Sequence, residues 1–415
     1  MSNLVLSSNL KSPLVLSSTD PSKVEVMSYE VPKSTGILVK NWSRTTCKNE
    51  PAAGANMVGK TASIDITRMG KWQLSSVRVA FGLEGTAPTG VLGAIGLRIA
   101  DLQLWNFGSM LFNQDHAVLM ARVNMLPLAE KMAVYQKALL LLDDGTEDIV
   151  TGTPNTTTAY CTYVPFLAPS TTTTRNNWDL EVLEPLIIKV TVNSNTTIGL
   201  VAASTIFPTP GSTFDAIFQT VDYEPEYKQQ LYLENFGTQG LYVPYLSFDS
   251  ETQFTVPTGV TTTTVKLATS VPAIFNHSYI RPVTTAVGIL GLTPVFAKIH
   301  RINVKLNNQT YIENIPAQAL NLKAEMAGSA GLILIENGTL KIDPNKIHTI
   351  CWSDKPASRT SFSGCLAYGS IDLPEFVFTY ATLIVADYEI VIVTEYLCEM
   401  LMSGTTGKIM KSIAS

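Results

Sequence analysis

The chain has 415 residues, of which 46% are hydrophobic and only 15% are charged, against about 25% in an average soluble protein. A chain of this length predicts roughly two domains of about 200 residues each. The low charge and the positive mean hydropathy indicate a surface that is largely buried against other copies of the chain. The formal net charge is −5 and no two Lys or Arg residues are adjacent, which excludes a basic arm that packages nucleic acid.

The cysteines are scattered and none belongs to a Cys-x-x-Cys pair, so we predict buried thiols and neither a disulfide framework nor a zinc site. They are Cys47, Cys161, Cys351, Cys365 and Cys398. Residues 1–16 lack a charged region followed by an apolar run, and no segment reaches the roughly 20 apolar residues of a membrane span. We therefore expect synthesis in a cytoplasm, where the Asn-x-Ser/Thr sequons stay unmodified. The sequons begin at Asn41, Asn155, Asn195, Asn276, Asn308 and Asn337.

Along most of the chain the hydrophobic pattern is that of β-strands. Residues 1–40 are rich in Ser, Pro and Lys and have no sustained period, which predicts an extended N-terminal arm that ties neighbouring subunits together. From Thr61 apolar and polar residues alternate over 61–66, and a second alternating run covers 186–192 before the turn residues 193–195. These runs predict strands.

One segment has helical spacing instead. Pro127 stands at a first helical position, and apolar residues follow it at helical intervals as far as Leu142, which predicts a single surface helix. Three Thr-rich stretches, at 156–158, 171–174 and 261–264, predict long loops or exposed strands. Such loops carry the variable outer surface of β-barrels.

A repeat at an offset of 200 residues divides the chain. A strand pattern over 97–104 leads through a turn at 106–108 to a helix-compatible stretch at 117–120, and the same order recurs from residue 297. The matched positions are Ile99 with Ile299, Leu102 with Ile302, Leu104 with Val304, and Ala117 with Ala317. We predict an internal duplication with its boundary near residues 223–227. The expected organisation is an arm over 1–40, a first domain over 41–223 and a second domain over 224–415.

Several segments occur in an order that known proteins share. Residues 67–74 (TRMGKWQL) contain a Gly at the entry to a strand, and the strand from Leu97 precedes the first helix-compatible stretch. A Pro-Phe stretch at 163–166 is followed by a Leu-Pro-Leu-Ile-like strand at 183–190, and residues 355–372 hold Pro, Ser-Gly and Ser-Ile-Asp in that order. In this order, from about Ile64 to Leu401, the chain resembles the double jelly-roll major capsid proteins of adenoviruses, membrane-containing phages and large nucleocytoplasmic DNA viruses.

The resemblance implies an all-β fold of two tandem eight-stranded jelly-roll β-barrels with a few short helices in loops. It also implies a homotrimer that forms a pseudo-hexagonal capsomer, in which successive barrels are related by a turn of about 60°. The predicted partners are other copies of the chain, neighbouring capsomers, and minor capsid or penton proteins, and either an internal membrane or other proteins are expected to separate the shell from its genome. The family has no catalytic residue to transfer, and direct binding of nucleic acid is not expected.

The strongest competing motif is residues 54–61 (GANMVGKT), a literal match to the Gly-x4-Gly-Lys-Thr loop that holds phosphates. That chemistry needs a buried strand before the loop and a helix that begins at its Lys. The preceding residues 47–51 are polar and contain a Pro, and the following residues 62–66 alternate as a strand. We therefore interpret the motif as a Gly-rich loop.

Other candidate sites have no supporting pattern. Residues 143–148 hold four carboxylates around a Gly, but their spacing is not that of an EF-hand, and we predict a solvated acidic loop. No histidine belongs to a His-x-x-x-His or His-Glu-x-x-His motif, and there is no Gly-x-Ser-x-Gly elbow, so we predict structural or surface roles. The histidines are His116, His277, His300 and His348.

The sequence therefore predicts a subunit of a viral capsid shell, located in the virion, whose mechanism is self-assembly. We predict no catalytic, cofactor-binding or metal-binding residue and no cofactor. Two alternatives remain open: a spike or adhesin β-sandwich that binds a receptor or glycan, and a nucleotide hydrolase.

Overall fold

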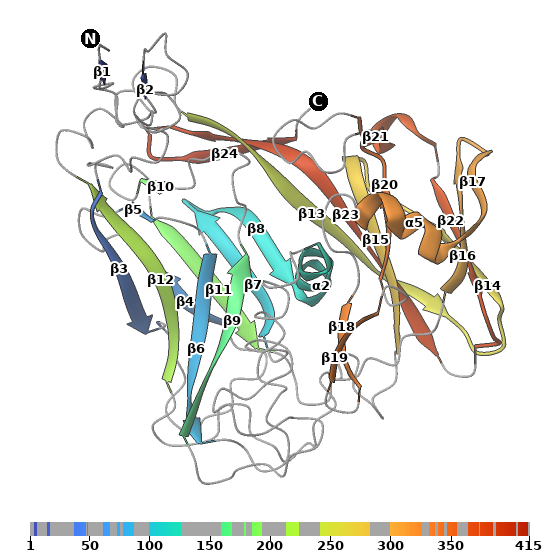
Figure 1. Cartoon of the computed structure of the whole chain (residues 1–415), viewed down its shortest axis with the longest axis horizontal. Helices are drawn as coiled ribbons and strands as arrows, with labels where there is room; N and C mark the ends of the chain where they lie inside the picture. The colour runs from blue at the N-terminus through green and yellow to red at the C-terminus, as the bar shows by residue number, and fades with distance from the viewer. Residues whose placement is uncertain are drawn as a thin grey trace.

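The described part of the chain folds almost entirely into antiparallel β-sheets, as predicted (Figure 1). In this computed structural model the described residues are 4–5, 15–16, 37–46, 48, 61–66, 73–74, 78–86, 99–125, 159–167, 178–179, 185–192, 213–223, 241–282, 299–325, 332–336, 339–343, 347–354, 364–372, 374–384, 387–403 and 406–413. All structural statements below concern these residues.

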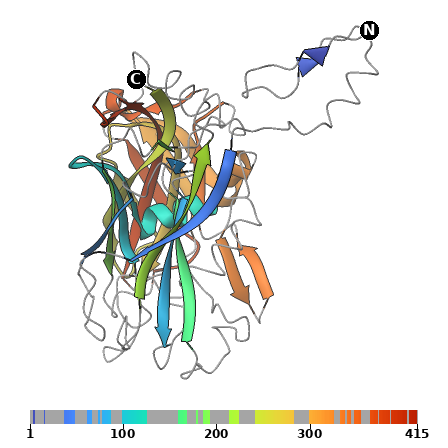
Figure 2. The ribbon, with the colours of Figure 1, turned by 90° about the vertical axis from the view of Figure 1, so that its left-hand side faces the viewer.

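The first half of the chain forms two sheets. One has the strand order β4-β11-β7-β8, and the other contains the order β3-β12-β6-β9, with two short strands β5 and β10 at its edge. In Figure 2 the β3-β12-β6-β9 sheet faces the viewer, on the side of the first barrel away from the second half. The bounds are β3 Ile37–Thr46, β4 Thr61–Asp65, β5 Gln73–Leu74, β6 Arg78–Thr86, β7 Ile99–Asn106, β8 Ser109–Asp115, β9 Ala159–Leu167, β10 Trp178–Asp179, β11 Leu186–Val192 and β12 Thr213–Tyr223.

The second half repeats this arrangement. Its sheets have the orders β14-β22-β16-β17 and β13-β23-β15-β20, which match the first half strand for strand. Each half is therefore an eight-stranded jelly roll, which confirms the predicted fold. The bounds are β13 Leu241–Val256, β14 Thr262–Lys266, β15 Pro272–Pro282, β16 Ile299–Leu306, β17 Gln309–Pro316, β20 His348–Cys351, β22 Glu375–Tyr380 and β23 Tyr388–Met402.

A few elements lie outside this common plan. Strands β21 (Leu366–Ala367) and β24 (Ile409–Ile413) extend the β13-β23-β15-β20 sheet. Two separate hairpins are formed by β18 (Leu332–Glu336) with β19 (Thr339–Asp343), and by β1 (Leu4–Val5) with β2 (Val15–Leu16). The 3-10 turn η3 covers Tyr368–Ser370.

The repeat at an offset of 200 residues corresponds to a hairpin followed by a helix. Strands β7 and β8 lead into α2 (His116–Asn124), and β16 and β17 lead into α5 (Ala317–Glu325). Both hairpins turn through two residues with positive φ, Phe107-Gly108 (45° and 82°) and Asn307-Asn308 (51° and 63°). This geometry is that of a type I′ turn, whose twist suits antiparallel strands. The predicted order of strand, turn and helix is confirmed in both halves.

The predicted pairing of Ala117 with Ala317 is wrong by one position. In β17, Ile312 pairs with Val304 but the next pair is Ile315 with Ile302, so β17 contains one residue more than β8 over this stretch. Asn314 adopts a φ of 55° in this bulge, where its backbone N–H donates to Asn303 Oδ1 at 2.6 Å. The additional residue moves the start of α5 to 201 positions after the start of α2.

The barrel interiors follow the predicted alternation. In β4 and β11 every second side chain is buried and its neighbours are partly exposed. The core of the second barrel takes residues from both sheets, with Phe376 and Phe378 of β22 facing Ile390 and Ile392 of β23. Burial of apolar side chains between two sheets is the main stabilising term of such a fold.

Some predictions remain open. The helix over 127–142 and the Thr-rich stretches at 156–158 and 171–174 lie outside the described residues, whereas 262–264 lies in the exposed strand β14. Strand β12 ends at Tyr223 and β13 begins at Leu241, on either side of the predicted boundary, and β3 begins inside the predicted arm. The division into 1–40, 41–223 and 224–415 stays a prediction.

The outer face of the β4-β11-β7-β8 sheet carries a polar ladder along β7. Trp105 Nε1 donates to Gln103 Oε1 at 2.9 Å, and Gln103 Nε2 donates to Asp101 Oδ2 at 3.3 Å. Burial raises the pKa of Asp101, and the charge of Asp115 adds to this rise, although hydrogen bonds from Thr191 and Gln103 oppose it. Asp101 Oδ1 is buried without a hydrogen-bond partner. Ionisation of Asp101 therefore opposes folding.

Replacing this carboxyl by an amide should stabilise the protein in a pH-dependent manner. Because the pKa of Asp101 is raised in the folded state, the protonated carboxyl contributes fully to stability below the ordinary value of 3.8. This contribution is lost as the pH rises through the folded-state pKa. Asp101→Asn should therefore melt at a higher temperature than the wild type at neutral pH, and the difference should shrink as the pH approaches 3.8. Thermal unfolding across this pH range, with the exposed Asp372→Asn as control, measures the effect. A gain that is the same at all pH values would contradict it.

Candidate functional site: the contact between the two barrels

The motifs that competed with a structural role do not form a catalytic site among the described residues. Residues 54–60 of the phosphate-loop match lie outside the described part, but Thr61 opens strand β4 where a phosphate loop requires a helix. The acidic segment 143–148 also lies outside it. Within the residues described, no three His, Cys, Asp or Glu side chains gather as metal ligands, and no helix is long and apolar enough to cross a bilayer.

The cysteines and histidines are dispersed. Cys351 and Cys398 are buried thiols as predicted, but Cys365 is exposed, so the prediction is wrong for that residue. Burial raises the pKa of the Cys398 thiol, against the opposing charge of Lys411. Side chains of Cys47, Cys161 and His116 are outside the described set. His300 is exposed on β16, whereas His277 and His348 are buried in neighbouring strands of the second barrel.

The contact between the two barrels brings together polar and aromatic side chains from both halves of the chain. Helix α2 of the first barrel lies against the outer face of the β13-β23-β15-β20 sheet (Figure 1). Asp115, the residue before the helix, accepts a hydrogen bond from Val118 N at 2.7 Å and so caps it. Its other carboxylate oxygen accepts from Ser250 Oγ of β13 at 2.8 Å. One side chain thus starts the helix and attaches it to the second barrel.

Apolar and aromatic packing covers this contact. The Arg122 guanidinium of α2 lies 5.2 Å from the ring centres of both Phe112 in β8 and Phe248 in β13. The two rings meet edge to face with their centroids 6.5 Å apart. Met125, just after α2, packs into a buried cluster with Phe275 and other side chains of the second barrel. The sheet face that α2 covers is therefore buried among apolar and aromatic side chains.

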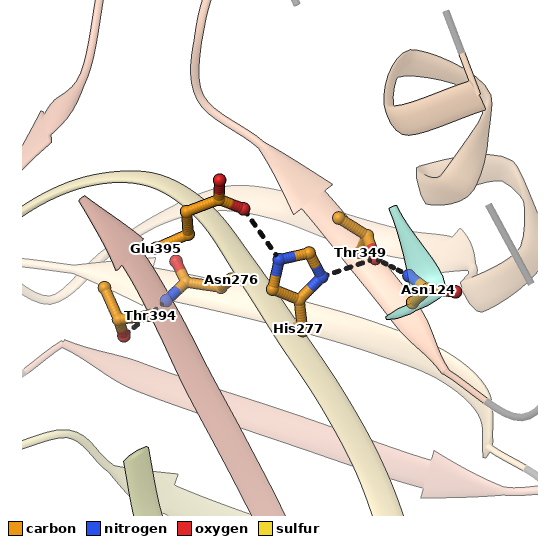
Figure 3. A network of polar contacts seen from close by, with 6 residues as sticks. All are labelled: Asn124, Asn276, His277, Thr349, Thr394 and Glu395. Carbon is orange, nitrogen blue, oxygen red and sulfur yellow. Dashed lines mark hydrogen bonds and ion pairs between the residues drawn. The ribbon is translucent and has the colours of Figure 1, made fainter. Parts of the chain in front are cut away.

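A chain of buried polar groups crosses the contact (Figure 3). Asn124, the last residue of α2, donates from Nδ2 to Thr349 Oγ1 of β20 at 3.1 Å. Thr349 Oγ1 lies 3.0 Å from His277 Nδ1, and His277 Nε2 lies 3.2 Å from Glu395 Oε2. When the imidazole carries its proton on Nε2, Thr349 can donate to Nδ1 and Nε2 can donate to Glu395 Oε2. His277 is fully buried and Glu395 nearly so.

The two equivalent helices meet at the same residue. Asn321 of α5 accepts a hydrogen bond from the backbone N–H of Thr349 at 2.7 Å, while Asn124 of α2 binds its hydroxyl. Asn276, the residue before His277, makes a separate set of contacts: its Nδ2 donates to Thr394 at 2.9 Å, and its Oδ1 accepts from Trp352 and Tyr368 at 2.6 and 2.7 Å. Burial raises the pKa of Tyr368. This network holds the two barrels in one relative orientation.

A second attachment lies at the C-terminal strand. Ile409 N of β24 donates to Asn106 Oδ1 of the first barrel at 2.8 Å, and Lys408 Nζ lies 4.2 Å from the centre of the Phe107 ring. Sequence analysis singled out none of these contacts. The polar run Asn276-His277-Ser278 within an otherwise apolar strand was the signal that could have indicated a buried polar network.

Breaking the network should destabilise the fold far more than breaking an exposed ion pair. His277→Ala leaves Glu395 buried without its hydrogen-bond partner, and a buried polar group left unsatisfied costs about 1–3 kcal/mol of unfolding free energy, or more when it is charged. Lys266→Ala, which removes an exposed ion pair with Glu375 in the same barrel, should cost at most about 1 kcal/mol. Urea unfolding of both variants tests this. Equal losses would mean that the network contributes no more than a surface pair.

Comparison with known proteins agrees with this architecture. No family model matches the sequence, and no curated protein matches it. Among solved structures, a capsid model of the virus PBCV-1 has a TM-score of 0.64 at 13% identity and covers 94% of this chain and 100% of that chain. The Faustovirus major capsid protein (TM-score 0.58, 10% identity, 94% and 95% covered) and the mavirus major capsid protein (0.55, 9%, 96% and 96%) are also similar. The chain thus has the double jelly-roll fold of viral major capsid proteins.

Proposed function

We propose that the protein is a viral major capsid protein that self-assembles as pseudo-hexameric homotrimers into an icosahedral shell. Its action is structural and not enzymatic. Its partners are two further copies of the chain, the neighbouring capsomers, and minor capsid or penton proteins. The chain is made in the host cytoplasm and located in the virion. The fold, shared over most of the chain with major capsid proteins, supports this proposal.

The observation that carries the proposal is an asymmetry between the two repeats. Strand β8 and helix α2 contact the second barrel of their own chain, and Leu111 of β8 is only 2% exposed. The equivalent hairpin β16–β17 is open to solvent, and Tyr311, at the position of Leu111, is 66% exposed. Ile315 is 38% exposed, and Gln318 and Ala319 in the first turn of α5 are also exposed. The second half therefore presents the surface that the first half uses for docking.

The sheet of the first barrel that is equivalent to the docking face of α2 lies at the other end of the molecule. Helix α2 docks on the outer face of β13-β23-β15-β20, and the equivalent sheet of the first barrel is β3-β12-β6-β9. In Figure 1 this sheet and the β16–β17 hairpin lie at opposite ends of the chain. A contact between unlike ends joins copies head to tail, and a ring closes when the rotations add up to a full turn. Six barrels from three chains, each about 60° from the next, would close such a ring.

The trimer and its interface can be tested together. Three chains of 45.1 kDa give 135.3 kDa, the mass expected from light scattering of the wild type. Tyr311→Asp with Ile315→Asp places charges on the exposed hairpin and should shift the mass to 45.1 kDa, because both residues would be buried in the contact. Leu383→Asp changes an equally exposed apolar residue in the turn between β22 and β23, and should leave the mass unchanged. A wild type that stays monomeric at micromolar concentration as protein and salt are raised would refute the trimer.

The shell should not bind its genome directly. Affinity for nucleic acid depends on Lys and Arg side chains that neutralise phosphates, and this chain has a net charge of −5 with no adjacent basic residues. Anisotropy titration with DNA and RNA at about 0.15 M salt should show binding no tighter than about 10⁻⁶ M. Sub-micromolar binding that weakens steeply with added salt would mean that the shell touches its genome.

A further inference from the structure

The turn between β7 and β8 carries a residue that the turn itself does not favour. Phe107 adopts a φ of 45° and its side chain is 59% exposed. At the equivalent position of the second barrel, Asn307 has a φ of 51°. A positive φ is common for Asn, whereas for a bulky side chain it is a rare and strained conformation. The first barrel thus holds a strained aromatic residue in water.

Other apolar side chains are exposed around Phe107. Met110, two residues after the turn, is 47% exposed, and Met410 of β24 is 53% exposed. Strand β24 is held beside the turn by the hydrogen bond from Ile409 N to Asn106 Oδ1. Phe107, Met110 and Met410 therefore belong to one end of the molecule although they come from both barrels. Exposed apolar groups that cluster in this way mark an interaction surface.

Lysines surround these apolar groups. Lys408 Nζ lies 4.2 Å from the ring centre of Phe107, and Lys189 Nζ lies 3.8 Å from that of Trp105, which pairs with Met110 across the hairpin. Within the described residues neither lysine forms an ion pair with a carboxylate. The exposed Glu399 lies opposite Ser412, further along β24. A chain with net charge −5 therefore presents unpaired positive charge here.

We propose that the turn patch, defined as Phe107, Met110, Lys189, Lys408 and Met410, binds the surface of an anionic lipid bilayer. The tip of a two-residue turn is convex, which suits insertion of an aromatic ring and two Met side chains at the boundary between headgroups and acyl chains. The lysines then meet the anionic headgroups, and each strengthens binding about fivefold.

The proposed trimer would increase the affinity of the turn patch for a membrane. In a ring with threefold symmetry, three copies of the patch lie on one face of the capsomer, so binding of the first brings the others to the same bilayer. This increase rests on the proposed function, whereas the patch itself is complete within one chain.

Vesicle flotation tests the inference on the full-length protein. The wild type should float with vesicles of about 30% phosphatidylserine in phosphatidylcholine, but weakly with pure phosphatidylcholine or in about 0.5 M salt. Phe107→Asn should lower the affinity about tenfold or more, while its melting temperature should change little, because Asn suits the turn although the contact with Lys408 is lost. Lys408→Gln should lower affinity for the anionic vesicles about fivefold.

The same flotation assay provides a control variant and the results that would contradict the inference. Leu383→Asn removes an equally exposed apolar group far from the patch in sequence and should float like the wild type. A wild type that does not float with anionic vesicles, equal flotation on pure phosphatidylcholine, or undiminished flotation of Phe107→Asn would overturn the inference. Light scattering of the same samples separates the two proposals: trimers that do not float refute only the patch, and monomers that float through Phe107 refute only the trimer.

Discussion

The burial of helix α2 on the second barrel is the contact on which the shape of the whole molecule depends. The sheet face beneath the helix carries His277, Thr349 and Glu395, which need hydrogen-bond partners once water is removed. Asn124 can donate its hydrogen bond to Thr349 only when helix α2 ends at one place on that face. Apolar packing around Met125 supplies the burial but would tolerate a range of positions. The hydrogen bonds therefore specify the angle between the barrels, while the apolar contacts stabilise it.

The two copies of the hairpin and helix differ in the partner that each would meet in the proposed trimer. Helix α2 meets a sheet of its own chain, which is present as soon as the protein folds, and it can bury Val118 and Leu119. Helix α5 has the exposed Gln318 and Ala319 in its first turn. In the proposed assembly this surface is exposed to water until a second chain binds, so it must remain soluble before that. The lower hydrophobicity of the second copy thus fits a surface that is used only on assembly.

Patterns of short range allowed most of the fold to be predicted. The alternation from Thr61 indicated β4, and the order of strand, turn and helix indicated the duplication, because both depend on neighbouring residues. The polar network could not be predicted, since Asn124 and Thr349 are separated by 225 positions and His277 and Glu395 by 118. Nor did spacing indicate the bulge at Asn314, because a single added residue leaves the hydrophobic pattern of a short strand almost unchanged.

Comparison of equivalent positions in the two halves also distinguishes residues that the fold requires from residues that it only tolerates. Both type I′ turns impose the same backbone geometry, so the fold alone would select the same kind of residue in each. In the second barrel Asn307 satisfies this geometry, and its Oδ1 accepts a hydrogen bond from Asp372 N at 2.7 Å. In the first barrel the Phe107 ring contacts Lys408 and otherwise largely faces solvent. Neither the turn nor the barrel core gains from an aromatic ring at this position, so the contact with Lys408 and the proposed contact with a bilayer are the benefits that offset the strain.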